Sequence, residues 1–153
     1  MKITILQRNI EWANPALNVQ RADEAIDRNP GADLYVLPEM FSTGFCTHPE
    51  GIAENCEGDS LEWMKRKAQA IDAAIAGSIA VTQDGKYYNR FYFVKPDGEV
   101  TWYDKKHLFT YGGEHKRFTA GSERVVVEWR GVRILLEVCY DLRFPVWARN
   151  RGD

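Results

Sequence analysis

Apolar residues follow strand-like and then helix-like spacings over the first part of the chain. The run KITILQ at residues 2–7 is apolar and β-branched, which predicts a first strand. Asn14 can cap a helix whose first position is Pro15. Apolar residues then recur at helical spacing, at Val19, Ala22 and Ile26. The unbroken run DLYVL at 33–37 is typical of a strand buried on both faces, so this stretch predicts a β-α-β unit.

A second helix is expected over residues 60–72, and a long strand after it. The apolar face of this helix consists of Leu61, Met64, Ala68 and Ile71. Its basic residues are expected to be turned mostly to water, namely Lys65, Arg66 and Lys67. The run AIAGSIAVT at 74–82 then returns the chain to the sheet.

Turn signals replace helical spacing in the second half of the chain. The sequences DG at 84–85 and PDG at 96–98 flank KYYNRFYFV, which predicts a meander of antiparallel strands. Residues 105–121 hold three glycines and no sustained periodicity, and so long an irregular segment is often functional. The runs RVVVEW and VRILLEV, joined by a turn at 130–131, predict a final hairpin that leads to Cys139. The expected fold class is α/β with mixed sheets.

Composition narrows the class of protein. With 153 residues, 44% of them hydrophobic and 27% charged, the chain suits one globular domain over residues 1–153. A net charge of −2 with both signs interspersed gives no basic field, which argues against a nucleic-acid partner. No apolar run approaches the roughly 18 residues that cross a bilayer, and the N-terminus lacks the pattern of a secretory signal. We therefore expect a cytoplasmic protein with no membrane association.

Cysteine and histidine usage points to neither disulfides nor a metal. Three cysteines, Cys46, Cys56 and Cys139, form an odd set without framework spacing, as in a reducing compartment. The chain has three histidines, but it has no CxxC, HxH or HExxH spacing, so no metal site is expected.

Cys139 stands where an apolar run turns abruptly polar, in VCYDLRFP. A thiol at such a turn can act as a nucleophile if a cation and a carboxylate lie near it, and the backbone N–H of Tyr140 can face a developing oxyanion. The sequence supplies both groups at other strand ends, as Glu39 after LYVLP and as Lys105 with Lys106 after VTWYD. Taken singly, each residue also has an ordinary interpretation, as a packed thiol, a salt-bridged acid or a solvated lysine.

Three motifs in this order, LPEMFSTGF, YDKKHLF and VCYDLRFP, resemble the signatures of the carbon–nitrogen hydrolase (nitrilase) superfamily. The resemblance implies a nitrilase-type αββα sandwich with mixed sheets. It implies that Glu39 is the general base, Lys105 the catalytic lysine and Cys139 the nucleophile, with Lys106 in a variable position. Glu114, in GGEH, would be the additional active-site glutamate.

The same resemblance implies hydrolysis of a non-peptide amide through a thioester, with release of ammonia. The implied partners are a small amide and water, and no metal or organic cofactor is required. The sequences MFSTGF and GGEHKRFTAG look most like the omega-amidase branch, which acts on 2-oxo dicarboxylic acid monoamides such as 2-oxoglutaramate.

Such substrates carry a carboxylate, for which the sequence offers three cations, Arg143, Lys116 and Arg117. Aromatic residues that flank the motifs are expected to line the pocket, namely Phe41, Phe45 and Tyr111.

The resemblance also bears on length and assembly. Family members continue beyond the nucleophile motif, so we expect the chain to be the N-terminal portion of such a domain, ending after that motif. A homodimer or higher homo-oligomer is expected. Two alternatives stay open at this point: a truncated, catalytically inactive chain that acts only through subunit association, and an amidase or nitrilase of different substrate range.

Overall fold

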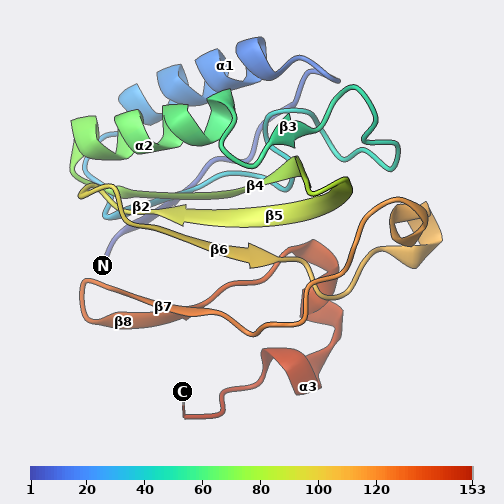
Figure 1. Ribbon diagram of the computed structural model, residues 1–153. Coiled ribbons are helices and arrows are strands. Elements are labelled where there is room, and N and C mark those ends of the chain that lie inside the picture. Colours follow the sequence, from blue (N-terminus) through green and yellow to red (C-terminus); the bar gives the residue numbers. More distant parts are fainter. Residues whose placement is uncertain (153) are drawn as a thin grey trace.

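The computed structural model describes residues 1–152, so Asp153 lies outside the described residues. Three layers are stacked in it: two helices, a six-stranded sheet, and a two-stranded hairpin (Figure 1). The longer helices are α1 (Pro15–Asp27) and α2 (Asp59–Ile71). The main-sheet strands are β1 (Ile3–Ile5), β2 (Leu34–Val36), β3 (Glu54–Asn55), β4 (Ala74–Gln83), β5 (Lys86–Val94) and β6 (Val100–Asp104). The hairpin and the short helical turns are β7 (Val126–Trp129), β8 (Val132–Leu135), η1 (Thr110–Gly112), η2 (Glu114–Lys116), η3 (Cys139–Arg143) and α3 (Pro145–Ala148).

The main sheet is mixed, as the sequence predicts. Its order is β1-β2-β4-β5-β6, with β3 paired to β4 off this path. Strands β1, β2 and β4 run parallel, and β4, β5 and β6 pair antiparallel. The predicted β-α-β unit and the predicted meander are therefore both confirmed.

Both predicted helices form where their end signals stand. The Asn14 side chain accepts a hydrogen bond from the backbone N–H of Leu17 at 3.2 Å, and Pro15 occupies the first turn of α1. Helix α2 ends at Ile71, and the residue that caps it, Asp72, has a φ of 48° in the left-handed region. None of the helices within residues 1–152 is long and apolar enough to cross a membrane.

Lys67 differs from its prediction. Its side chain is only 10% exposed, and its Nζ lies 3.0 Å from Asp23 Oδ1 and 2.8 Å from Asp27 Oδ1. The two acids are on α1, so the apolar periodicity of α2 alone cannot predict these ion pairs. Lys67 thus joins the two helices of the outer layer, and the expectation that it turns to water is wrong.

Strand β4 separates two apolar cores. Ile75 and Ile79 pack under the helices, whereas Ala74 and Ala76 face the hairpin. Alternate residues of a strand point to opposite faces, and both faces of this strand are covered. This explains why the run AIAGSIAVT contains no charge.

The segment after β2 continues along β4. Leu37 N donates to Ala76 O at 2.7 Å, and Met40 N donates to Ser78 Oγ at 2.8 Å. A Cβ on Gly77 would lie 2.8 Å from Leu37 Cβ, so only glycine allows this close approach. The position of Glu39, between Leu37 and Met40, is thereby fixed against the centre of the sheet.

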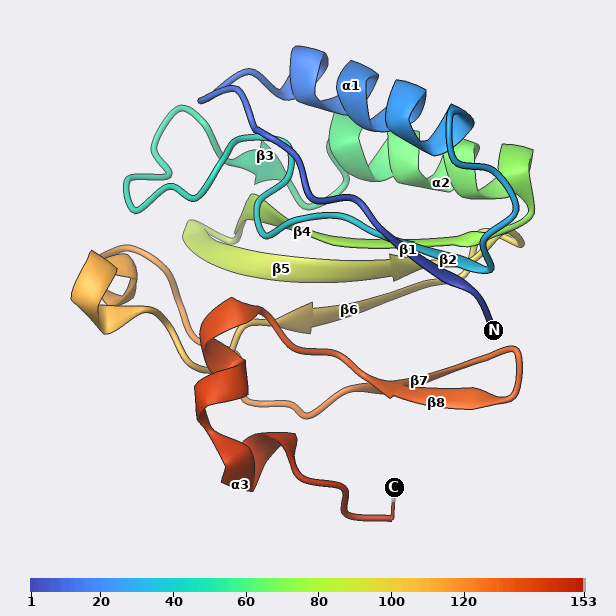
Figure 2. The ribbon, with the colours of Figure 1, turned by 180° about the vertical axis from the view of Figure 1, so that it is seen from behind.

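The hairpin β7–β8 lies against the other face of the main sheet and leads to η3 (Figure 2). Strand β8 ends at Leu135, earlier than predicted. After it the regular ladder gives way to a single backbone hydrogen bond, from Leu136 N to Val125 O at 2.9 Å. Leu136 and Val138 are nevertheless buried. Cys139 therefore follows an extended buried segment instead of the end of a ladder.

We predict that Ile79→Ala lowers the free energy of unfolding by about 2–5 kcal/mol, because Ile79 is 1% exposed in the core under the helices. The matched control is Ile5→Ala, since Ile5 is 73% exposed, and its cost should be within about 0.5 kcal/mol. Urea unfolding of both variants measures the difference. Equal losses would show that this core does not stabilise the fold as described.

Candidate active site

Glu39, Lys105 and Cys139 line one cavity, although 100 residues of chain separate the first from the last. Glu39 follows β2, Lys105 follows β6 directly, and Cys139 opens η3. The cavity has a volume of about 560 Å³ and is lined by Glu39, Phe45, Lys105, Phe109, Tyr111, Cys139, Tyr140 and Arg143. The three motifs thus converge as the sequence predicts.

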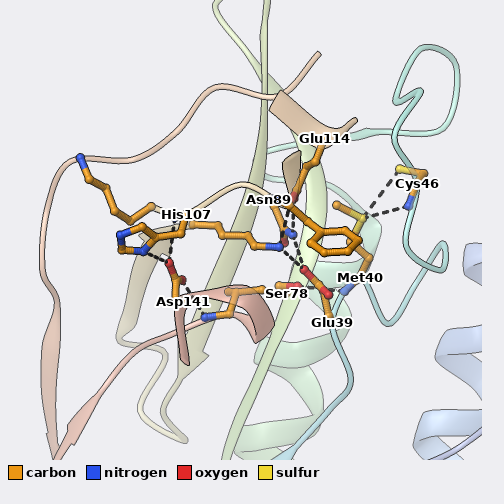
Figure 3. Close-up of polar contacts among 12 residues, drawn as sticks. Glu39, Met40, Cys46, Ser78, Asn89, His107, Glu114 and Asp141 are labelled. Atoms are coloured by element: carbon orange, nitrogen blue, oxygen red, sulfur yellow. Dashed lines mark hydrogen bonds and ion pairs between the residues drawn. The ribbon is translucent and has the colours of Figure 1, made fainter. Parts of the chain in front are cut away.

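The Lys105 ammonium lies between two carboxylates. Its Nζ donates to Glu39 Oε1 at 2.7 Å and to Glu114 Oε2 at 3.0 Å (Figure 3). The side chains of Lys105 and Glu114 are fully buried, and that of Glu39 is 18% exposed. Burial lowers the pKa of Lys105, but the charges and hydrogen bonds of the two acids outweigh it and raise that pKa overall. Lys105 is therefore held as a cation.

The backbone of Lys105 is fixed from both sides. Its N–H donates to Asn89 O at 3.0 Å, and its carbonyl accepts from Gly121 N at 3.0 Å. A Cβ on Gly121 would lie 2.1 Å from Asp104 O, so a larger residue cannot approach this way. Gly121, in the irregular segment 105–121, thus allows the close contact that fixes the backbone of Lys105.

Glu114 lies beside Lys105, where the resemblance puts the additional glutamate. It is carried by the short turn η2, and its Oε2 also accepts a hydrogen bond from Phe109 N at 2.6 Å. A buried carboxylate needs hydrogen-bond partners, and Lys105 and Phe109 supply them to Glu114.

Cys139 is exposed to the cavity and has a φ of 45°, uncommon for a non-glycine residue. Burial, followed by the charge and hydrogen bonding of Glu39, raises the pKa of the Cys139 thiol, while Lys105 partly opposes them. The resting thiol is therefore protonated near neutral pH.

Asp141 is fully buried and holds the turn of Cys139 to the segment of Lys105. Its Oδ2 accepts from Val138 N at 3.0 Å and from the Tyr103 hydroxyl at 2.8 Å. Its Oδ1 accepts from His107 N at 2.8 Å and lies 2.8 Å from His107 Nδ1. His107 also stacks on Phe144, with ring centroids 3.7 Å apart.

Sequence reasoning missed two buried polar residues of this site, Asn89 and Asp141. The sequence contained a usable signal for Asp141. An acid two residues after the candidate nucleophile needs hydrogen-bond donors, which have to come from the turn around it. The sequence contained little signal for Asn89, because a single asparagine in KYYNRFYFV is also compatible with the solvent face of a strand.

The predicted pocket residues divide. Phe45, Tyr111 and Arg143 line the cavity, and so does Tyr140, which is expected from the sequence only as a backbone donor. Phe41 does not: it is fully buried in the core under the helices, with its ring centroid 5.8 Å from that of Trp63. Regular strand alternation would put Glu39 and Phe41 on the same face, but Met40 between them has a φ of 46° and turns the chain, so Phe41 points into the core.

The two other candidate cations lie outside the lining of this cavity. Lys116 and Arg117 line a separate, smaller hollow, and Arg117 Nε lies 3.4 Å from Glu50 Oε1. Within residues 1–152, no group of three or more His, Cys, Asp or Glu side chains could hold a metal ion.

The sequence matches the family model of the carbon–nitrogen hydrolases over residues 2–151. The chain belongs to this family. Omega-amidase YafV of Escherichia coli K12 is 47% identical over 154 residues, which cover 100% of this chain and 59% of that protein. The 2-oxoglutaramate amidase of Bacillus subtilis is 34% identical over 152 residues, covering 97% of this chain and 59% of that relative.

A solved structure from the same family shows the same fold. It is a carbon–nitrogen hydrolase superfamily protein of Xanthomonas campestris with an arsenic adduct in its active site. It superposes with a TM-score of 0.95 at 41% identity, over 99% of this chain and 57% of that chain. The expected nitrilase-type α/β fold is thereby confirmed, and the chain spans somewhat over half the length of these family members.

We predict that Asp141→Asn lowers the free energy of unfolding by about 1–3 kcal/mol, because one amide oxygen cannot satisfy the buried donors that two carboxylate oxygens satisfy. Asp84→Asn is the control, because Asp84 is exposed in a turn. Urea unfolding compares the two variants. If both unfold alike, Asp141 does not hold the turn.

Proposed function

We propose that the chain carries the catalytic machinery of a cysteine-dependent amidase of the carbon–nitrogen hydrolase family. The observation that supports this most is the contact of Lys105 with both Glu39 and Glu114 in the cavity that exposes Cys139. Names of the relatives, an omega-amidase and a 2-oxoglutaramate amidase, support amide hydrolysis.

The first half-reaction is acylation. Glu39 takes the thiol proton of Cys139, and the sulfur attacks the carbonyl carbon of the amide. Negative charge develops on the carbonyl oxygen, which is stabilised by the Lys105 ammonium and by the backbone N–H of Tyr140. Glu39 then gives its proton to the leaving nitrogen, the C–N bond breaks and ammonia leaves a thioester on Cys139.

The second half-reaction is hydrolysis of the thioester. Glu39 takes a proton from water, the hydroxide oxygen attacks the carbonyl carbon, and the C–S bond breaks. The carboxylic acid product leaves, and the proton returns from Glu39 to the Cys139 sulfur. Every step uses groups of the cavity and water.

The substrate is proposed to be a short 2-oxo dicarboxylic acid monoamide, such as 2-oxoglutaramate. Arg143 is the cation in the cavity lining other than Lys105, and Lys105 is already paired with two acids. A guanidinium suits a carboxylate because it donates two parallel hydrogen bonds. We assign Arg143 to the distal carboxylate and Tyr111 to the apolar wall beside it.

Homo-oligomeric assembly and a cytoplasmic location stay predictions from the sequence.

Cys139→Ala should abolish ammonia release from 2-oxoglutaramate and remove the transient acyl adduct seen by intact-protein mass spectrometry, because no other group in the cavity can form the thioester. Cys56→Ser is the control and should keep both, since Cys56 does not line the cavity. Ammonia release that survives Cys139→Ala would overturn the assignment. If the folded parent chain itself releases no ammonia, the result favours the alternative of a truncated, catalytically inactive chain.

Arg143→Met should raise KM for 2-oxoglutaramate by roughly 10- to 100-fold, because a charge-assisted hydrogen bond contributes about 1.5–3 kcal/mol. KM for an uncharged aliphatic amide should change little. The comparison of the two substrates on the same variant separates loss of the carboxylate contact from general damage. A parallel rise in both KM values would contradict the role of Arg143.

A further inference from the structure

Asn89 lies inside the site, and the reaction as proposed does not use it. It is carried by β5, is fully buried, and lies between Glu39 and Glu114 (Figure 3). Its Nδ2 donates to Glu39 Oε1 at 2.8 Å and to Glu114 Oε1 at 3.0 Å. One side-chain amide therefore joins the two acids.

The orientation of this amide is dictated by charge. If it were rotated, Oδ1 would face two carboxylate oxygens, and acceptors would oppose acceptors. In the orientation that remains, Oδ1 is buried and has no hydrogen-bond partner within residues 1–152. A buried carbonyl without a partner costs stability, so an asparagine here is explained by its two N–H groups.

Asn89 and Lys105 form two parallel bridges across the same pair of acids. The cluster of Glu39, Glu114 and Lys105 carries two negative charges and one positive charge, so the ammonium alone does not balance it. The Asn89 amide supplies two further donors without adding a charge. Both bridges reach Oε1 of Glu39, so Oε2 of that carboxylate is engaged by neither of them.

We propose that Asn89 is a positioning residue that holds Glu39 on Glu114 and so directs its second carboxylate oxygen toward the Cys139 thiol. This inference rests on the proposed function, in which Glu39 takes the thiol proton.

The test is the pH profile of Cys139 alkylation by iodoacetamide, followed at the peptide level by mass spectrometry, in Asn89→Leu, Glu39→Gln and the double variant. All are made in a Cys56→Ser background. The buried Cys46 reacts slowly, because burial raises its pKa to about 11. Alkylation needs no turnover, so the measurement works even in a chain that releases no ammonia.

The expected direction follows from the effect of the Glu39 charge on the Cys139 thiol. Glu39 raises the pKa of the thiol, so Glu39→Gln should move the midpoint of the alkylation profile to lower pH. Asn89→Leu should move it in the same direction, because it frees Glu39 from its position. The double variant should match Glu39→Gln alone, since Asn89 acts through Glu39.

The matched control is Asn18→Leu. Asn18 is also fully buried, but its Nδ2 donates to the backbone carbonyls of Glu11 and Ser42, at 2.7 and 2.8 Å. This variant should melt at lower temperature with an unchanged alkylation profile. If Asn89→Leu does not fold, Asn89→Ser replaces it, because serine is too short to reach both acids.

Three outcomes would overturn one or both of two statements. If the shifts of Asn89→Leu and Glu39→Gln add in the double variant, or if Asn89→Leu leaves the profile unchanged, Asn89 does not position Glu39. If Glu39→Gln itself leaves the profile unchanged, Glu39 does not act on the thiol, and the proposed base fails together with this inference.

Discussion

The Lys105 ammonium, buried between Glu39 and Glu114, is the interaction on which the site depends. Charges taken out of water are tolerated only when they are paired and hydrogen-bonded. Here one cation, directly after β6, is paired with two acids from separate segments, Glu39 after β2 and Glu114 in η2. These three segments must therefore lie close together for the charges to be compensated.

Close backbone packing supports this pairing. Gly77 lets the segment before Glu39 lie on β4, and Gly121 lets the chain lie against Lys105. Asp141 fixes the turn of Cys139 through its bonds to Val138 and His107. None of these three residues lines the cavity, yet each fixes the backbone beside Glu39, Lys105 or Cys139. The geometry of the site thus depends on the backbone as much as on the side chains that line the cavity.

Much of this could be predicted from the sequence, because the elements obey local rules. Asn14 and Pro15 mark the start of α1, and the turn signals mark the meander. The three motifs identified Glu39, Lys105 and Cys139 as neighbours. What could not be predicted depends on contacts between distant elements: the pairing of Lys67 with α1, the burial of Phe41 and the bridge made by Asn89. Periodicity reports which face of an element is apolar, but it does not report what that face meets.

The free energy of unfolding of Lys105→Met, measured by urea beside that of Lys106→Met, tests the central claim most directly. Lys105 is fully buried with two acids, whereas its neighbour Lys106 is only half-buried and lies over the Trp147 ring. Removing the buried cation leaves two uncompensated carboxylates, which predicts a loss of about 3–5 kcal/mol for Lys105→Met. The loss for Lys106→Met should stay below about 1 kcal/mol. Similar losses for the two variants would contradict the account.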